Sequence, residues 1–150
     1  GFGVKVIFHD ILLGLEDEFA SQVSLEELQK NADILSLHIP LDESTHYLVD
    51  EKFISKMEKN FYFVNTARGK NLKTSALVDA IKNGKVLGAA LDVLEYEKSS
   101  FENLDASNED LDFLLKSEKA IVTPHIAGWT HQSKEKLAQF IVDKIVAKFH

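Results

Sequence analysis

The chain has 150 residues, of which 45% are hydrophobic and 27% charged, and these values allow one globular domain with a substantial core. Its formal net charge of -7 argues against nucleic acid as a partner, because a phosphate backbone requires a local excess of Lys and Arg. The absence of cysteine excludes disulfides, zinc-thiolate sites and thiol catalysis, and no apolar run is long enough to span a bilayer. We therefore expect a soluble, cytoplasmic protein with neither nucleic-acid nor membrane partners.

The chain opens on Gly1-Phe2-Gly3 without a methionine and enters an apolar segment at once. Glycines in such a position follow the end of a helix. We therefore interpret the 150 residues as a fragment of a larger protein.

Short apolar runs alternate with amphipathic segments along the whole chain. This alternation is typical of a parallel sheet whose strands are joined by helices. The predicted fold class is therefore α/β, a Rossmann-like doubly wound parallel sheet with helices on both faces. The predicted strands are residues 4–9, 34–38, 61–65, 86–92 and 120–123.

Helix signals lie between the predicted strands. Ser24 begins a capping box, in which it and a Glu three residues later satisfy free backbone amides, and this predicts a helix over residues 25–31. A second helix is predicted over residues 50–57. Thr74 is interpreted as the N-cap of a third helix that stops at Gly84.

Two longer segments complete the chain. Residues 95–112 are acidic and polar, so we expect a long exposed loop with a short helix near its end. Residues 131–149 repeat apolar side chains at steps of three and four, which predicts a helix that packs against the rest of the domain.

Chemistry-bearing residues gather where the predicted strands end. In an open α/β sheet, ligands bind beyond the carboxyl ends of the strands, so these residues belong to one edge of the sheet even when they are far apart in sequence. In chain order they are Asp10, then His38-Ile39-Pro40, then Asn65-Thr66-Ala67-Arg68-Gly69, then Asp92 with Glu95 and Glu97, and finally Pro124-His125.

Asp10 closes the first predicted strand. A carboxylate at the end of the second strand of a dinucleotide-binding fold accepts hydrogen bonds from the adenosine ribose and repels a 2′-phosphate, which favours NAD over NADP. The alternative is that Asp10 merely begins a turn toward Gly14. The chain contains no Gly-x-Gly-x-x-Gly loop. The first strand and the glycine-rich loop of such a fold are therefore expected to be missing from it.

Three further residues suggest acid-base chemistry on a carboxylate substrate. Arg68 offers a planar fork that could hold a 2-oxoacid and polarise its carbonyl, although alone it could equally form a surface ion pair. His125 has a side chain suited to proton transfer near neutral pH, and taken singly it could be structural. Glu97 could pair with His125 and fix its tautomer, and Glu95 is the alternative partner.

The six histidines could suggest a metal, but no pair has the spacing that a metal site needs, so none is predicted. We expect His38 instead to shape a turn under the cofactor together with Pro40, which restricts the residue before it to extended backbone.

Taken together, these segments resemble the D-isomer-specific 2-hydroxyacid dehydrogenase family. They occur in the order and at the spacing of that family across nearly the whole chain. The matching segments are Ser-Leu-His-Ile-Pro at 36–40, Asn-Thr-Ala-Arg-Gly at 65–69, Gly-Lys-Val-Leu-Gly-Ala-Ala-Leu-Asp-Val at 84–93, and Thr-Pro-His-Ile-Ala-Gly at 123–128.

The resemblance implies NAD as cofactor and hydride transfer between its nicotinamide and a D-2-hydroxyacid or 2-oxoacid, with a 3-phosphoglycerate dehydrogenase as the favoured member. It implies that Arg68 binds the substrate carboxylate and carbonyl, that His125 exchanges a proton with the substrate oxygen, and that Glu97 assists His125. The cofactor-binding residues that it implies are Asp10, His38, Ile39, Pro40, Thr45, Thr66, Ala67, Arg68, Asp92, His125 and Gly128.

Under this resemblance, residues 1–150 are a partial NAD-binding domain that lacks the phosphate loop and the separate substrate domain. We expect the fragment alone to be inactive and the parent protein to form a homodimer. The alternative is a non-catalytic NAD(H)-sensing or interaction module of the same fold.

Overall fold

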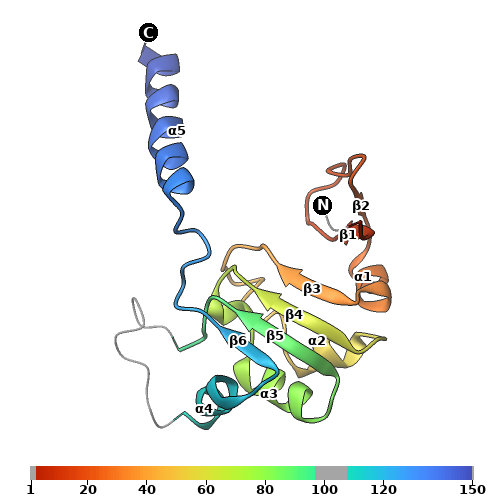
Figure 1. The fold of residues 1–150 in the computed structure, drawn as a ribbon. Helices are drawn as coiled ribbons and strands as arrows, with labels where there is room; N and C mark the ends of the chain where they lie inside the picture. The colour runs from red at the N-terminus through yellow and green to blue at the C-terminus, as the bar shows by residue number, and fades with distance from the viewer. Residues whose placement is uncertain (1–2, 97–107, 150) are drawn as a thin grey trace.

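The computed structural model describes residues 3–96 and 108–149. Figure 1 shows two separate groups of parallel strands, ordered β1-β2 and β3-β4-β5-β6. In chain order the elements are β1 (Val6–Phe8), β2 (Ala20–Gln22), α1 (Leu25–Asn31), β3 (Ile34–Leu37), α2 (Glu51–Lys56), β4 (Phe61–Asn65), the 3-10 turn η1 (Gly69–Asn71), α3 (Thr74–Lys82), β5 (Val86–Leu91), α4 (Glu109–Lys116), β6 (Ala120–Val122) and α5 (His131–Phe149).

The Rossmann-like α/β fold is confirmed, and every strand pairing among the described residues is parallel. The strands form two sheets, however, because β1 pairs with β2 and not with the four-stranded sheet. Strand β2 was not predicted, since its three residues include a serine and form no apolar run. Set against the Rossmann order 3-2-1-4-5-6, the strands β2, β1, β3, β4 and β5 match places 3, 2, 4, 5 and 6, and β6 adds one further strand beside β5. The place between β1 and β3 has no counterpart among the described strands.

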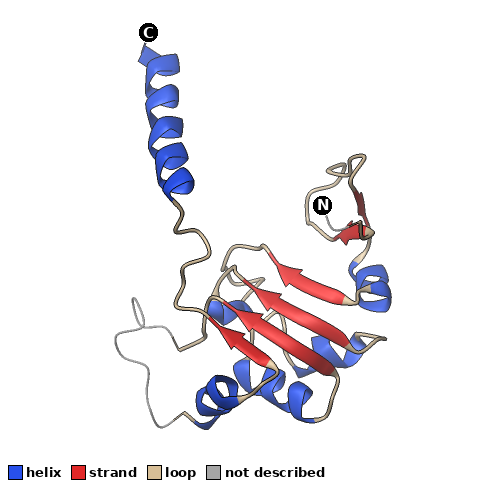
Figure 2. Ribbon diagram, in the orientation of Figure 1, coloured by secondary structure: helices blue, strands red, loops and turns tan. Residues whose placement is uncertain are grey.

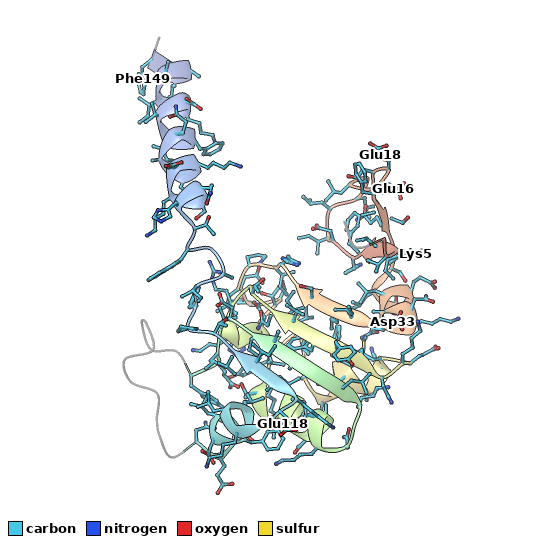
Figure 3. The ribbon with its side chains drawn as sticks, in the orientation of Figure 1. Lys5, Glu16, Glu18, Asp33, Glu118 and Phe149 are labelled. Carbon is cyan, nitrogen blue, oxygen red and sulfur yellow. The ribbon has the colours of Figure 1, made fainter. Side chains whose placement is uncertain are left out.

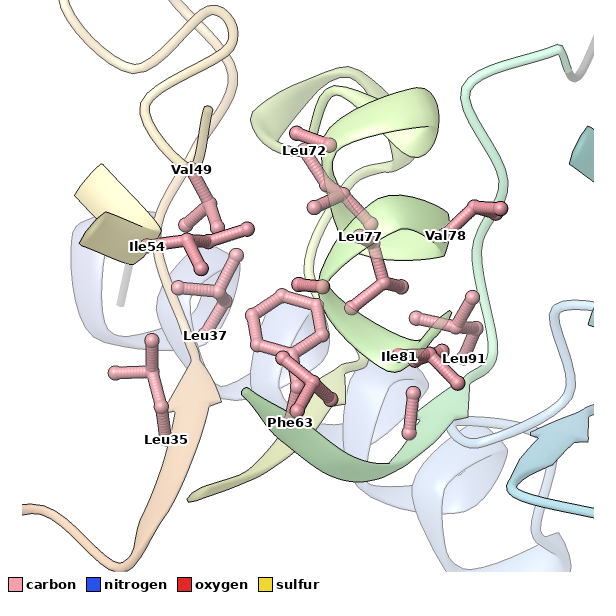
Figure 4. Packing of buried hydrophobic residues seen from close by; sticks show 14 of the residues in the cluster. Leu35, Leu37, Val49, Ile54, Phe63, Leu72, Leu77, Val78, Ile81 and Leu91 are labelled. Carbon is pink, nitrogen blue, oxygen red and sulfur yellow. The ribbon is translucent and has the colours of Figure 1, made fainter. Parts of the chain in front are cut away.

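The core lies between the four-stranded sheet and the helices (Figure 4). Leu35 and Leu37 of β3 and Phe63 of β4 point into it, and Leu77 and Ile81 of α3 pack against them. Alternate residues of these strands are buried because successive side chains of a strand point to opposite faces. Each such side chain contributes about 1.5–3 kcal/mol through burial, so this layer holds the strand ends in place.

Helices α1 to α4 lie on one face of this sheet and α5 packs on neither, so the helices predicted on both faces are not found among the described residues. Helix α1 contacts α2, α2 contacts α3, and α3 contacts α4 (Figure 2). In addition, α3 contacts β5 and α4 contacts β6. On the opposite face Ile34 lies beside Tyr62 in the strand register, and both side chains are more than half exposed, as is Ile121 of β6.

The helix starts agree with the sequence in two cases and differ in one. The Ser24 hydroxyl accepts a hydrogen bond from the Glu27 N–H at the start of α1, and the helix predicted over residues 50–57 is α2, capped by Asp50. Thr74 is not the N-cap of α3, because Lys73 occupies that position without a side-chain cap. The Thr74 N–H donates instead to the carboxylate of Glu95, which is remote in sequence, at 2.8 Å.

Helix α5 forms where the apolar repeat predicts it but does not pack as expected. None of its described residues is buried, and Phe149 at its far end points away from the sheet (Figure 3). The segment after β6 carries this helix away from the body of the domain (Figure 1). Within the described ranges no helix is both long and apolar enough to cross a membrane.

Candidate active site

The carboxyl ends of β3, β4, β5 and β6 lie at the same edge of the sheet, because these strands are parallel and adjacent. The loop after each strand carries part of the predicted site. The structure therefore brings the loops of His38, Arg68, Asp92 and His125 to one edge, as expected from the sequence.

The loop after β4 is a tight turn built on Asn65, whose side chain is fully buried. The Asn65 amide oxygen accepts from the Ala67 N–H at 3.0 Å, and its amide nitrogen donates to the Arg68 carbonyl at 3.1 Å. Arg68 itself is exposed, and its guanidinium donates to the Ala67 carbonyl at 2.7 Å. The turn thus fixes the backbone while it leaves the Arg68 and Thr66 side chains at the surface.

Gly69 packs directly against the chain that follows β5. A Cβ atom at this position would lie 1.9 Å from the Leu94 carbonyl oxygen and 2.6 Å from the Glu95 nitrogen. Only a residue without a side chain permits this approach. The loop that carries Arg68 is therefore held against the segment that leads from Asp92 toward Glu97.

The loop after β3 is organised by short polar contacts. The His38 ring Nε2 lies 2.9 Å from the Ser36 hydroxyl, and the His38 side chain is exposed. The Thr45 hydroxyl donates to the Pro40 carbonyl at 2.8 Å. Ile39, which lies between His38 and Pro40 in sequence, is half-buried. This arrangement fixes a compact turn at the sheet edge.

Asp92, directly after β5, is a buried carboxylate that holds the loop after β6. Its Oδ1 accepts from the Thr123 hydroxyl at 2.6 Å and from the Ile126 N–H at 2.9 Å, and its Oδ2 accepts from the Ala127 N–H at 2.8 Å. Burial acts to raise the pKa of Asp92, but these hydrogen bonds, with the nearby charge of His125, lower it below its ordinary value. Asp92 is therefore ionised at neutral pH and fixes the position of the loop.

His125 lies inside that loop, between the residues that Asp92 binds. Its backbone has a φ of 54°, a left-handed conformation that a residue with a side chain rarely adopts. The His125 N–H donates to the Thr123 carbonyl at 3.0 Å, and the ring is exposed. Gly128, three residues later, has open space around its Cα, since a Cβ there would meet nothing within 4 Å.

Both carboxylate oxygens of Glu95, the alternative partner considered for His125, accept hydrogen bonds from other residues. Its Oε1 accepts from the Tyr47 hydroxyl at 2.5 Å, and its Oε2 accepts from the Thr74 N–H at the start of α3. The hydrogen bond to Glu95, together with burial, raises the pKa of Tyr47 to about 12. Glu97, the predicted partner, lies outside the described residues.

Asp10 lies at the end of β1, on the two-stranded sheet and apart from the Arg68 loop (Figure 1). Its Oδ1 accepts from the Leu12 N–H at 2.8 Å, which is the turn that the sequence offered as an alternative. The same side chain also lines an open hollow formed by residues of this sheet and the loops around it, namely His9, Asp10, Leu13, Glu16, Gln22, Val23 and Ser24.

Two residues that support the site were not predicted from the sequence. Asn71 is fully buried in the 3-10 turn after Arg68, and Tyr47 lies in the loop after β3 at a φ of 53°. Neither carries a local signal, because burial of a polar side chain depends on which loops meet. Within the described ranges no group of three His, Asp or Glu side chains could hold a metal ion.

Comparison with known proteins points to one family. The model of the D-isomer specific 2-hydroxyacid dehydrogenase NAD-binding domain matches residues 1–127. A D-specific alpha-keto acid dehydrogenase of Enterococcus faecium is 40% identical over 138 residues, which are 89% of this chain and 42% of that protein. A glyoxylate reductase of Thermococcus litoralis is 36% identical over 150 residues, 98% of this chain and 42% of its own length.

Solved structures of the same family are also similar to this chain. The crystal structure of a D-lactate dehydrogenase with NAD+ from Lactobacillus jensenii superimposes with a TM-score of 0.85 at 30% identity, covering 97% of this chain and 45% of that one. The chain thus spans less than half the length of the proteins that it matches.

Proposed function

The chain belongs to the D-isomer specific 2-hydroxyacid dehydrogenases, and we propose that it supplies most of the NAD-binding domain of such an enzyme. The enzyme would transfer a hydride between nicotinamide and a small D-2-hydroxyacid or 2-oxoacid. Because residues 1–150 contain no Gly-x-Gly-x-x-Gly loop and span less than half the length of the relatives that they match, we propose that they do not catalyse turnover alone.

This proposal rests on the three hydrogen bonds by which the Asp92 carboxylate holds the loop of His125, next to the turn of Arg68. We call these three hydrogen bonds the Asp92 clamp. Three side chains with different chemistry thereby follow three adjacent strands, β4, β5 and β6. An enzyme gains most of its rate from groups held in place before the substrate arrives. The buried supports of Arg68 and His125 provide that order, while both side chains stay exposed to a ligand.

Each of these residues has a distinct proposed role. Arg68 binds the carboxylate and carbonyl of the substrate, since its guanidinium presents parallel donors. His125 donates a proton to the carbonyl oxygen during reduction and removes it from the hydroxyl during oxidation. Glu97 favours the protonated form of His125 and fixes its tautomer.

The residues present fit NAD. The hollow beside Asp10 combines the carboxylates of Asp10 and Glu16 with the apolar side chain of Leu13, and a carboxylate beside an apolar surface suits the ribose and base of an adenosine. When bound, NAD supplies the hydride acceptor or donor. We propose that Asp10 binds the adenosine ribose, that Asp92 faces the carboxamide of nicotinamide, and that the remaining contacts come from His38, Ile39, Pro40, Thr45, Thr66, Ala67, Arg68, His125 and Gly128.

Substrate and assembly are proposed only by class. The relatives are named for lactate, glyoxylate and alpha-keto acids, which supports a small 2-oxoacid, and 3-phosphoglycerate is a further member of the class to be assayed. We propose that the full-length protein is a homodimer, as the resemblance implies.

The proposal is tested with full-length protein, NADH and a panel containing pyruvate, glyoxylate and 3-phosphohydroxypyruvate, followed by NADH absorbance. His125→Ala is expected to lower kcat by about a thousandfold or more while the protein still binds NADH. His131→Ala, an exposed histidine at the start of α5, is the matched control. Near-normal turnover by His125→Ala would contradict the assignment, and tight NADH binding without any turnover by the unmutated protein would favour the sensing module.

A further inference from the structure

The side chain of Asn71 connects two parts of the proposed site that are far apart in sequence. Its Oδ1 accepts from the Arg68 N–H at 3.1 Å. Its Nδ2 donates to the Pro40 carbonyl and to the Thr45 carbonyl, each at 3.1 Å. The amide therefore joins the turn of the proposed substrate-binding arginine to the loop of two proposed cofactor contacts.

The burial of Asn71 makes this connection specific. The side chain is completely inaccessible to solvent. Its oxygen accepts one hydrogen bond, and its amide nitrogen donates two, one for each hydrogen. A flipped amide would place an N–H group against the Arg68 N–H and an oxygen against two carbonyls. Only one orientation satisfies the three partners, so Asn71 fixes the two loops relative to each other.

The backbone alone does not reach these positions. Residues 47–49 and 70–73 form a short parallel ladder, in which the Tyr47 N–H donates to the Lys70 carbonyl and the Val49 N–H to the Asn71 carbonyl. That ladder fixes the end of the loop nearest to α2. The side chain of Asn71 reaches the other part, at residues 40 and 45, where the proposed cofactor contacts lie.

We propose that Asn71 is a positioning residue that sets Arg68 and the 40–45 loop in register for substrate and NADH together. This inference rests on the proposed function, because it assigns to Arg68 the substrate and to the 40–45 loop the cofactor. It adds a residue that touches neither ligand and acts through the backbone of both loops.

Two substitutions separate the two connections. Asn71→Asp has nearly the same shape and keeps an acceptor for the Arg68 N–H, but it turns an oxygen toward the Pro40 and Thr45 carbonyls. It is expected to raise the Kd for NADH about tenfold and to leave the KM for the 2-oxoacid, at saturating NADH, within about twofold. Asn71→Ala removes all three hydrogen bonds and is expected to raise both constants severalfold.

The matched control is Asn83, whose Oδ1 accepts from the Lys85 N–H at 3.0 Å beyond the end of α3. Asn83→Asp and Asn83→Ala are expected to leave both constants within about twofold. NADH titrations by fluorescence, steady-state kinetics with the best substrate of the panel and thermal unfolding are carried out on all four variants of the full-length protein. If Asn71→Asp does not fold, Asn71→Ala carries the test through the joint rise of both constants.

A purely structural asparagine would give a different pattern. If Asn71→Asp changes the Kd and the KM by the same factor, or if Asn71→Ala changes neither constant at a temperature where it is fully folded, the positioning role is overturned. Absence of 2-oxoacid turnover in the unmutated protein would instead overturn the proposed function and the Arg68 half of the inference. The NADH titration of Asn71→Asp would still decide the 40–45 half.

Discussion

Replacing Asp92 by Asn tests how the loop of His125 is held. The carboxylate accepts three hydrogen bonds, two at Oδ1 and one at Oδ2. An amide can accept at only one of these atoms, so at least one backbone N–H, of Ala127 or of Ile126, would face a second donor. An unpaired donor costs about 1–3 kcal/mol. Because the side chains of this loop are exposed, we expect about 2 kcal/mol.

The cost of this unpaired donor should destabilise the loop after β6 locally, without unfolding the whole domain. A loss of about 2 kcal/mol corresponds to a roughly thirtyfold fall in protection of the affected amides against hydrogen exchange. NMR-detected exchange on the 150-residue chain measures it directly at Ile126 and Ala127. Asp79→Asn, an exposed aspartate on α3, is the control and should leave both amides unchanged. Unchanged protection in Asp92→Asn would refute the clamp.

The pH dependence of the clamp has a definite sign. Because folding lowers the pKa of Asp92, its contribution to stability is fully present above the unfolded pKa of about 4 and is lost as the pH falls through the lower folded value. The difference in protection between the unmutated chain and Asp92→Asn should therefore be constant from about pH 5 to 8 and shrink in acid. A difference that grows toward low pH would contradict this reasoning.

Gly69→Ala is expected to destabilise the chain by about 3 kcal/mol or more in a urea titration, because its Cβ would overlap the Leu94 carbonyl, whereas Gly128→Ala should stay within about 0.5 kcal/mol. In an alkaline titration of tyrosinate absorbance, Tyr47 should ionise near pH 12, and Tyr47→Phe should abolish that step. Since folding raises this pKa from 10.0, the stabilisation from its bond to Glu95 is present below pH 10.0 and is lost as the pH rises toward 12. The isolated chain should self-associate through the open edge of β3, and a monodisperse monomer in light scattering would argue against it.

The local signals of the sequence were sufficient for most elements of the fold. The apolar run at residues 61–65 coincides with β4, and the capping box at Ser24 starts α1 where it was predicted. Such patterns depend only on the period of the side chains and on the nearest backbone amides. The start of α3 was misjudged because its cap is the carboxylate of Glu95, which arrives from a loop after the next strand.

For the site, the sequence was sufficient to predict which loops come together, but not the buried residues that support them. Parallel topology alone brings the loops of Arg68, Asp92 and His125 to one edge, so their association could be expected before any coordinates. The supports could not be expected, because the burial of Asn71 and the bond between Tyr47 and Glu95 depend on how separate loops pack. Whether Glu97 meets His125 stays a prediction.

The small sheet that carries Asp10 has a thermodynamic consequence. Residues 3–22 include no buried side chain, and β1 and β2 are joined by three paired positions only. A two-stranded unit of this kind is marginally stable, so it can unfold locally while the helix-covered core stays intact. Any nucleotide that uses Asp10 must first order this unit, and its apparent affinity is the intrinsic affinity multiplied by the fraction of molecules in which the unit is formed. Under the proposed role of Asp10, the strength of adenosine binding therefore depends on a folding equilibrium of residues 3–22 as well as on the contacts of the carboxylate itself.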